Sequence, residues 1–312
     1  MVIAMLGRRL ALSVVLVVVV PSLTFFLEAL SPGNVAQEVL GLTATPAQIN
    51  TFLKTYGLNE PLYQQYWHWL SQALQGNLGD SYTNGVSVTS ELGAGLPVTI
   101  SLIAGSLLVA ILLGVLLGVG SALGGRRSRR AVDILSTVGL AIPPFWLGIG
   151  LILVFAVKVE IFPATGYVGP TTSPGAWLQS LVLPCLAIGI GMSTVIAKQT
   201  RDQLRLALER PYIRTFRANG ASEVSIIFRH ALRNAGIPVV TVIGLLFINC
   251  LTASVFIEGV FALPGLGSLL ATSAQTHDLP SVEGVAICFV LIVMVVNFLV
   301  DLTYGWLNPR VR

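Results

Sequence analysis

Long stretches without a charged residue alternate with short polar segments along this chain. A helix needs about 20 apolar residues to cross the hydrocarbon layer of a membrane. Most of the uncharged stretches meet this length, whereas prolines and glycines interrupt residues 161–176. The pattern therefore predicts an all-α membrane protein with six transmembrane helices, at residues 10–27, 92–125, 134–157, 177–197, 234–257 and 284–300.

The composition supports a membrane location. Of the 312 residues, 54% are hydrophobic and 10% are charged, whereas soluble domains carry about 25% charged residues. A soluble core cannot absorb so much apolar surface. The first apolar stretch follows Arg8 and Arg9, as the core of a signal peptide would. No small-x-small cleavage site follows in "FFLEALSPG", which favours an uncleaved first helix.

The basic residues indicate the topology. All Lys and Arg residues except Lys54 and Lys158 lie before the first predicted helix, between the second and third, between the fourth and fifth, or after the sixth. Short connections rich in Lys and Arg stay on the cytoplasmic side of a membrane. We therefore expect both termini and the two basic connections to be cytoplasmic, which agrees with an even number of spans.

The segment 31–91 then lies outside the membrane and is too long for a turn. The stretch "TPAQINTFLKTYG" predicts a helix capped by Thr45, with Gln48 completing a capping box and Gly57 ending the helix. A second helix is expected at residues 61–76, which are rich in Tyr and Trp. Such residues gather at membrane boundaries. The segment is interpreted either as a cap on the outer membrane surface or as a dock for an external partner, and both roles are compatible.

These patterns divide the chain into three parts. Residues 1–30 form the cytoplasmic N-terminus and the first transmembrane helix. Residues 31–91 form the extracytoplasmic helical segment. The remaining residues, 92–312, form the transmembrane core of helices two to six and include a cytoplasmic loop at 198–236.

The sequence contains no motif of a nucleotide-binding or hydrolytic enzyme. A P-loop requires GxxxxGK[ST], and none of the lysines follows a glycine. The three histidines are far apart without HExxH, and no GxSxG occurs. The three cysteines lie in apolar stretches without CxxC spacing, as small buried residues do. We therefore expect no catalytic residue and no metal site in this chain.

The connection between the fourth and fifth predicted helices carries an amphipathic segment. Pro211 and Gly220 bound a short helix, and Ser222 caps a second helix with Glu223 in its first turn. The apolar residues that follow at helical spacing predict one buried stripe, formed by Val224, Ile227, Phe228, Ala231, Leu232 and Ala235. The opposite, basic face favours anions, either lipid headgroups or a protein partner. The helix–glycine–helix geometry favours a docking surface.

The stretch "YIRTFRANGASEVSIIFRHALRNAGIPVV" resembles the cytoplasmic loop of ABC importer permeases of the dipeptide/oligopeptide family. The general consensus of that loop begins Glu-Ala-Ala six residues before a glycine. Here Arg214, Thr215 and Phe216 occupy these places, a departure typical of the peptide branch, and Gly220 matches the glycine. Further stretches resemble the B-type permease of this family in the same order, over nearly the whole chain: "YGLNEPLYQQYWHWLSQALQGNLGDS", "GLAIPPFWLGIGLILVFA" with "FPATG", "VFALPGLGSLL" with "HDLPSVEG", and "NPRVR".

The resemblance implies a type I ABC importer permease in a bacterial cell (inner) membrane, forming half of the translocation pathway for di- or oligopeptides or a similar small solute. It would assemble with a second homologous permease, two ABC ATPase subunits and an extracytoplasmic substrate-binding protein. The chain would also contact membrane lipid, and no nucleic acid is expected as a partner. ATP and Mg would act on the ATPase subunits, with no cofactor in this chain. Dipeptides, oligopeptides, haem, nickel chelates and glutathione all remain open as the substrate.

The resemblance also implies residues that contact the ATPase subunit. These are Arg214, Arg217, Ala218, Asn219, Gly220, Ala221, Ser222, Arg229 and His230. Glu258 and Asn297 lie at the ends of apolar helices, where either a structural role or a place on the translocation path is open. The alternative function is an ATP-independent secondary transporter or channel. That class would need ion-coupling carboxylates near the membrane midplane and an inverted repeat, and the sequence shows neither.

Overall fold

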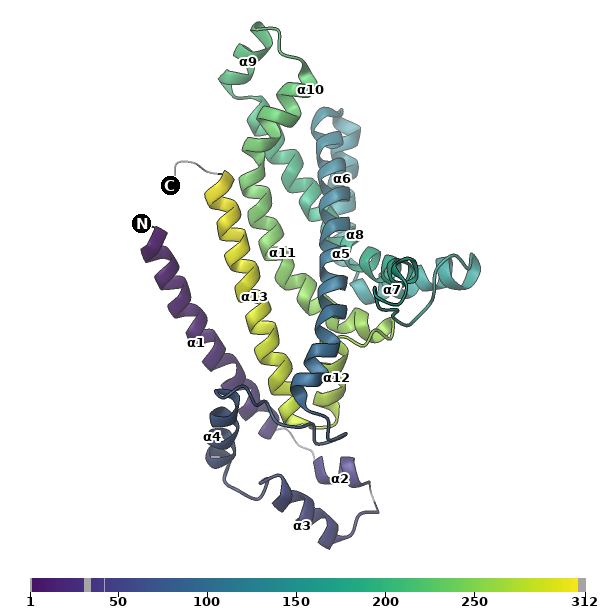
Figure 1. Ribbon diagram of the computed structural model, residues 1–312. Helices are drawn as coiled ribbons and strands as arrows, with labels where there is room; N and C mark the ends of the chain where they lie inside the picture. The colour runs from purple at the N-terminus through teal and green to yellow at the C-terminus, as the bar shows by residue number, and fades with distance from the viewer. Residues whose placement is uncertain (1, 31–34, 42, 308–312) are drawn as a thin grey trace. The chain divides into compact units, whose positions relative to one another are not determined.

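The computed structural model describes residues 2–30, 35–41 and 43–307, and in these ranges helices joined by turns and loops make up the chain, without a strand (Figure 1). The prediction of an all-α protein is confirmed. The elements are α1 (Val2–Ala29), α2 (Val35–Leu40), α3 (Pro46–Thr55), α4 (Leu62–Ala73), α5 (Val88–Leu123), α6 (Arg126–Ala141), α7 (Pro144–Leu151), the π-helix η1 (Ile152–Lys158), α8 (Pro174–Leu208), α9 (Pro211–Ala218), α10 (Glu223–Ser225), the π-helix η2 (Ile226–Ala231), α11 (Leu232–Val260), α12 (Leu266–Gln275) and α13 (Leu279–Leu307).

Among the residues that the structure describes in full, four helices are individually long and apolar enough to cross a membrane: α5, α8, and the Pro238–Val260 and Leu279–Val300 parts of α11 and α13. A fifth candidate is the pair formed by α6 and the helix Pro144–Lys158. The apolar helix Val15–Ala29, the part of α1 whose side chains the structure describes, is shorter. Each of the six predicted stretches therefore coincides with one of these helices, and four of the helices qualify on their own within the described residues.

The third predicted helix, 134–157, is not continuous. It is broken at Ile142 and Pro143, and the helices on either side are bent by 97°. A residue before proline is driven out of the helical conformation, and Ile142 is accordingly extended with ψ of 119°. Because proline has no N–H to donate, the helical hydrogen-bond ladder stops there. The two helices form either one broken span or a re-entrant loop.

The chain forms two compact units, each described here by itself. The first consists of residues 1–99 and 264–294, and the second of residues 100–263 and 295–312. Helices α5 and α13 each contribute residues to both units.

The helices α3 and α4 of the first unit match the sequence prediction. Thr45 caps α3, its side chain accepts a hydrogen bond from Gln48 N, and the Gln48 side chain accepts one from Thr45 N. After the helix, Gly57 takes a positive φ of 68°. Helix α4 packs on α1 through aromatic rings, with the centroids of Phe25 and Tyr66 5.4 Å apart. The predicted pair of helices between the first two spans is therefore confirmed.

A buried carboxylate ties the turn before α5 to the start of α13 in the first unit. Asp278 is 1% exposed. It accepts hydrogen bonds from Ser81 Oγ at 2.5 Å, from the Tyr82 backbone N at 3.0 Å, from Thr83 Oγ1 at 3.3 Å and from Ser281 Oγ at 3.1 Å. Since a buried charge requires such compensation, this cluster fixes the turn.

Helix α8 forms the core of the second unit, where most of its apolar length is buried against α6, α7 and α11. Glycines of α5 also approach it closely. A Cβ on Gly114 would lie 2.6 Å from Ile196 Cβ, and a Cβ on Gly118 would lie 2.6 Å from Thr200 Cβ. Small residues allow such close backbone approach between membrane helices, where packing rather than burial from water drives association.

Candidate functional site

The segment 210–235 forms a helix–turn–helix at one end of α8 and α11 (Figure 1). Pro211 occupies the first position of α9, where its missing N–H costs nothing. At the other end of α9, Gly220 takes a positive φ of 78°. The Gly220 N–H donates to Arg217 O and the Ala221 N–H donates to Phe216 O, each at 3.0 Å. This pair of bonds is a Schellman motif, so the predicted glycine stop is confirmed.

The second helix begins as predicted and then changes from an α-helix to a π-helix. The Ser222 side chain accepts a hydrogen bond from Ser225 N at 3.3 Å and so caps α10. The next residues form the π-helix η2, which runs without a break into α11. A π-helix has i→i+5 hydrogen bonds and holds an extra residue per turn compared with an α-helix.

Side-chain contacts cross the turn and fix its angle. The Arg217 guanidinium donates two hydrogen bonds to the Glu223 carboxylate, at 2.6 and 3.1 Å. The Phe216 ring stacks on His230 with centroids 4.1 Å apart. These contacts join α9 to α10 and η2. The hydrogen bond from Arg217 lowers the pKa of Glu223, and the same bond raises the pKa of Arg217, so both side chains are charged at neutral pH.

The inner side of this segment is anchored to the helices beneath it. Its apolar side chains join those of α5, α8 and α11 in one buried cluster, formed by Val119, Leu204, Ala207, Ile213, Ile226, Ile227, Ala231 and Ala235. Because α9 and η2 both contribute side chains to this cluster, the turn between them packs on buried residues and is not a free loop.

The predicted apolar stripe is partly wrong. Ile227, Ala231 and Ala235 are buried, but Val224 is 67% exposed and Phe228 is 58% exposed. The prediction assumed a spacing of 3.6 residues per turn, whereas η2 winds more widely. The wider turn brings Ile226 into the core next to Ile227 and leaves Val224 and Phe228 on the outer surface.

The outer surface of this segment is therefore both apolar and cationic. Val224 and Phe228 are exposed, as are Arg214, Arg229 and the residues of the turn itself, Ala218, Asn219, Gly220 and Ser222. Ala221 and His230 are partly buried. The structure thus brings all nine predicted coupling residues together in one helix–turn–helix. We call the exposed set Arg214, Ala218, Asn219, Val224, Phe228 and Arg229 the knuckle surface.

Sequence reasoning missed two features of this segment. It did not identify Glu223 as the partner of Arg217, although opposite charges on either side of a glycine turn could have indicated the pair. It also placed Arg201 among the basic residues of the loop. In the structure Arg201 is buried on α8 and pairs with Asp133 at 2.7 Å and Asp202 at 2.8 Å, so it joins α8 to α6.

The two candidates for a translocation path lie outside this segment. Glu258 is fully buried near the end of α11, and Asn297 is exposed on α13. Within the described ranges, no group of three or more His, Cys, Asp or Glu residues is arranged to hold a metal ion.

Known proteins are similar to this chain over nearly its whole length. Residues 110–312 match the family "binding-protein-dependent transport system inner membrane component", and residues 1–103 match the N-terminal part of such membrane components. A probable peptide ABC transporter permease of Sinorhizobium fredii is 35% identical over 98% of both chains. A probable D,D-dipeptide transport system permease of Escherichia coli is 35% identical over 93% of this chain and 92% of its own. A glutathione transport system permease of Salmonella choleraesuis is 34% identical over 98% of this chain and 97% of its own.

Solved structures show the same fold. A chain of the MetNI methionine ABC transporter in an inward-facing conformation aligns with a TM-score of 0.56 at 18% identity, covering 70% of this chain and 96% of its own. A second crystal form aligns with a TM-score of 0.55. The type I permease fold expected from the sequence is therefore confirmed. The chain belongs to the binding-protein-dependent transport system inner membrane component family and is a permease subunit of an ABC importer.

Proposed function

We propose that this permease carries di- or oligopeptides, or a similar small solute, across a bacterial inner membrane. The full-length similarity to permeases of peptide, D,D-dipeptide and glutathione systems carries the proposal, because the three names refer to a peptide, a dipeptide and glutathione, which is itself a small peptide. The chain provides half of the pathway, and a second homologous permease provides the other half. An external binding protein delivers the solute, and two ATPase subunits supply the energy.

The knuckle surface is the proposed contact with an ATPase subunit. It combines exposed apolar side chains with arginines, a mixture that suits a protein partner better than lipid headgroups, which would select for charge alone. The buried cluster beneath the knuckle surface and the contacts across the turn connect it to α8 and α11. A displacement of the knuckle surface by the ATPase subunit can therefore move these two helices. ATP and Mg bind to the ATPase subunits and not to this chain. Glu258 and Asn297 remain proposals for the translocation path.

The topology follows from the basic residues. We place both termini, the 125–130 connection and the 198–236 loop in the cytoplasm, and α2 to α4 outside. Single cysteines at Ser71 and Ser128, in a chain without its native cysteines, should test this placement. A membrane-impermeant maleimide added to intact cells should label position 71 and leave position 128 unlabelled. Labelling of position 128 from outside would overturn the assignment.

Reconstitution tests the function itself. Liposomes containing this chain, its second permease and the ATPase subunits should take up a labelled dipeptide only with internal ATP and the external binding protein. The purified chain alone should hydrolyse no ATP and transport nothing. Uptake by the chain alone, driven by an ion gradient, would instead support the secondary transporter or channel.

A further inference from the structure

The start of α13 carries two buried carboxyl groups with opposite surroundings. Asp278, just before the helix, accepts four hydrogen bonds and is therefore suited to the ionised form. Glu283 is fully buried in the first unit, and neither of its shielded carboxyl oxygens has a hydrogen-bond partner among the described residues. An ionised carboxylate is very costly to bury unless it is paired or hydrogen-bonded, and a neutral acid costs far less.

No positive charge is placed to compensate Glu283. The first unit contains three Lys or Arg residues. Lys54 is exposed on α3, and Arg8 and Arg9 lie about 30 Å along α1 from its last turn. The charged group that acts on Glu283 is another carboxylate, Glu28, in that last turn of α1. Two neighbouring carboxylates repel each other when both are ionised, so Glu28 adds to the cost of a charge on Glu283.

The imidazole of His277 is the other titratable group at this junction. Its Nδ1 lies 3.1 Å from Glu28 Oε1, and its Nε2 lies 3.8 Å from Glu38 Oε1 of α2. Both ring nitrogens therefore face carboxylates other than Glu283. The imidazole joins α1 and α2 to the turn before α13, and it leaves Glu283 without a donor.

Helix α5 packs against the same part of α13. Gly284 approaches Val88 of α5 so closely that a Cβ on the glycine would overlap the valine side chain. The acidic residue of α5 in this unit, Glu91, accepts a hydrogen bond from Ser281 Oγ at 3.1 Å. Close packing and an engaged carboxylate thus leave Glu283 no donor on this side.

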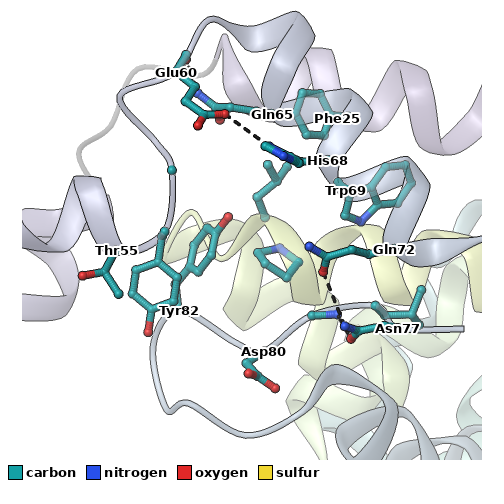
Figure 2. Close-up of a pocket in the computed structure, with 16 residues that line it drawn as sticks. Phe25, Thr55, Glu60, Gln65, His68, Trp69, Gln72, Asn77, Asp80 and Tyr82 are labelled. Atoms are coloured by element: carbon teal, nitrogen blue, oxygen red, sulfur yellow. Dashed lines mark hydrogen bonds and ion pairs between the residues drawn. The ribbon is translucent and has the colours of Figure 1, made fainter. Parts of the chain in front are cut away.

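A cavity of about 380 Å³ beside α4 brings solvent close to the junction (Figure 2). Phe25 and Leu279 line it, and they lie one helical turn from Glu28 and Glu283, respectively, on the same helices. The titratable side chains that line it are those of Tyr56, Glu60, His68, Asp80 and Tyr82. Water in this cavity can exchange a proton with the junction through a small local opening.

We propose that Glu283 is a proton-binding site at the junction of α1 with the start of α13. Within the described residues the acidic groups here are not arranged to hold a metal ion, whereas a proton needs no further ligand because it forms an O–H bond. With the proton bound, the neutral acid packs beside Glu28. When the proton passes to water, two carboxylates face each other without a donor for Glu283, and the junction loosens.

The direction of the pH dependence follows from these two states. An unfolded chain releases the proton of a glutamate near its ordinary value, about pH 4.3. The folded chain keeps this proton at pH values where the unfolded chain has lost it, so the stability of the first unit falls as the pH rises above that value. Because the adjoining segment is placed outside the membrane, the site responds to the external pH.

The test uses the full chain in phosphatidylcholine nanodiscs. Infrared spectroscopy near neutral pH should show the C=O stretch of a protonated carboxyl in the parent, and Glu283→Gln should remove it. Thermal unfolding of the parent, followed by tryptophan fluorescence, should begin about 2 °C lower for each pH unit above about pH 5 until the proton has left. Glu283→Gln, a neutral side chain of the same shape, should unfold like the parent near that pH and at a higher temperature than the parent in alkaline buffer.

Other titrating groups are present in both proteins, so the difference between them isolates Glu283. Glu160→Gln, at an exposed carboxylate of the second unit, is the matched control and should keep the infrared band and the pH dependence of the parent. The proposal is overturned if Glu283→Gln removes no protonated-carboxyl band, or if its unfolding depends on pH as the parent does. Failure of Glu283→Gln to fold in acidic buffer would also overturn it, because a neutral amide should fit where a neutral acid does. These measurements require neither an ATPase nor transport, so their outcome is independent of the proposed function.

Discussion

Gly220→Val should abolish uptake while the protein inserts into the membrane at normal abundance. Gly220 has φ of 78°, and no atom lies within 4 Å of a Cβ built there, so the substitution meets no steric clash. Its cost is conformational: about 1–2 kcal/mol for a non-glycine residue in the left-handed region, and more for a β-branched one. Coupling energies between sites are about 1–3 kcal/mol, so this strain is large enough to uncouple the knuckle surface from the ATPase.

The measurements are uptake in the reconstituted importer and the response of ATP hydrolysis to the loaded binding protein. We expect hydrolysis that no longer responds, or ATPase subunits that fail to co-purify. Gly166→Val is a matched control, because Gly166 also has a positive φ of 96° and open space around its Cβ, but lies away from the knuckle surface. It should retain uptake, as should Arg126→Ala in the other basic connection. Full uptake and stimulated hydrolysis in Gly220→Val would refute the coupling role.

Asp278→Ala should destabilise the first unit by about 2–4 kcal/mol. The substitution removes the acceptor for Ser81, Thr83, Ser281 and the Tyr82 backbone N–H. The three hydroxyls keep hydrogen bonds to each other or to Glu91, whereas the Tyr82 N–H loses its acceptor and the buried site loses its central carboxylate. Thermal unfolding of the purified protein, followed by tryptophan fluorescence, should begin at a lower temperature. Limited proteolysis should cut the turn at residues 83–87 faster, because these residues are exposed and the turn loses its anchor.

Asp80→Ala provides the control for this substitution. Asp80 is on the same turn, but its carboxylate is exposed and makes no hydrogen bond or ion pair with another described residue. Its loss should leave the unfolding temperature and the proteolysis rate nearly unchanged. Equal effects of the two substitutions would mean that Asp278 does not anchor the turn.

Local signals in the sequence were enough to predict the helical elements. The capping box at Thr45, the proline at the start of α9 and the glycine after it each act within a few residues, so each was predictable. The apolar stretches likewise located the membrane helices, since the requirement is mainly one of length and composition. The nine residues expected to contact the ATPase subunit were named through the resemblance, and their role stays a prediction.

Other features depend on contacts that a single sequence does not display. Three of the four hydrogen-bond partners of Asp278 come from residues almost two hundred positions earlier, and a cavity beside α4 is lined by α1, the outer turns and α13. The break at Pro143 was visible as a proline, but a proline inside an apolar stretch can be tolerated, as Pro184 is within α8. The exposure of Phe228 depends on the change of winding in η2, which no residue pattern indicated.

The wide turn of η2 has a consequence for insertions and deletions in this region. A π-helix corresponds to an α-helix that has gained one residue without losing continuity. Removing one residue from Ile226–Ala231 would therefore restore regular α-helical winding and leave α9 and α10 facing nearly the same direction relative to α11, because the wider turn already absorbs the extra residue. A single-residue deletion elsewhere in α11 would instead turn the part of the helix before it by about 100°. Relatives that differ by one residue within this turn would therefore present the same knuckle surface to their partners.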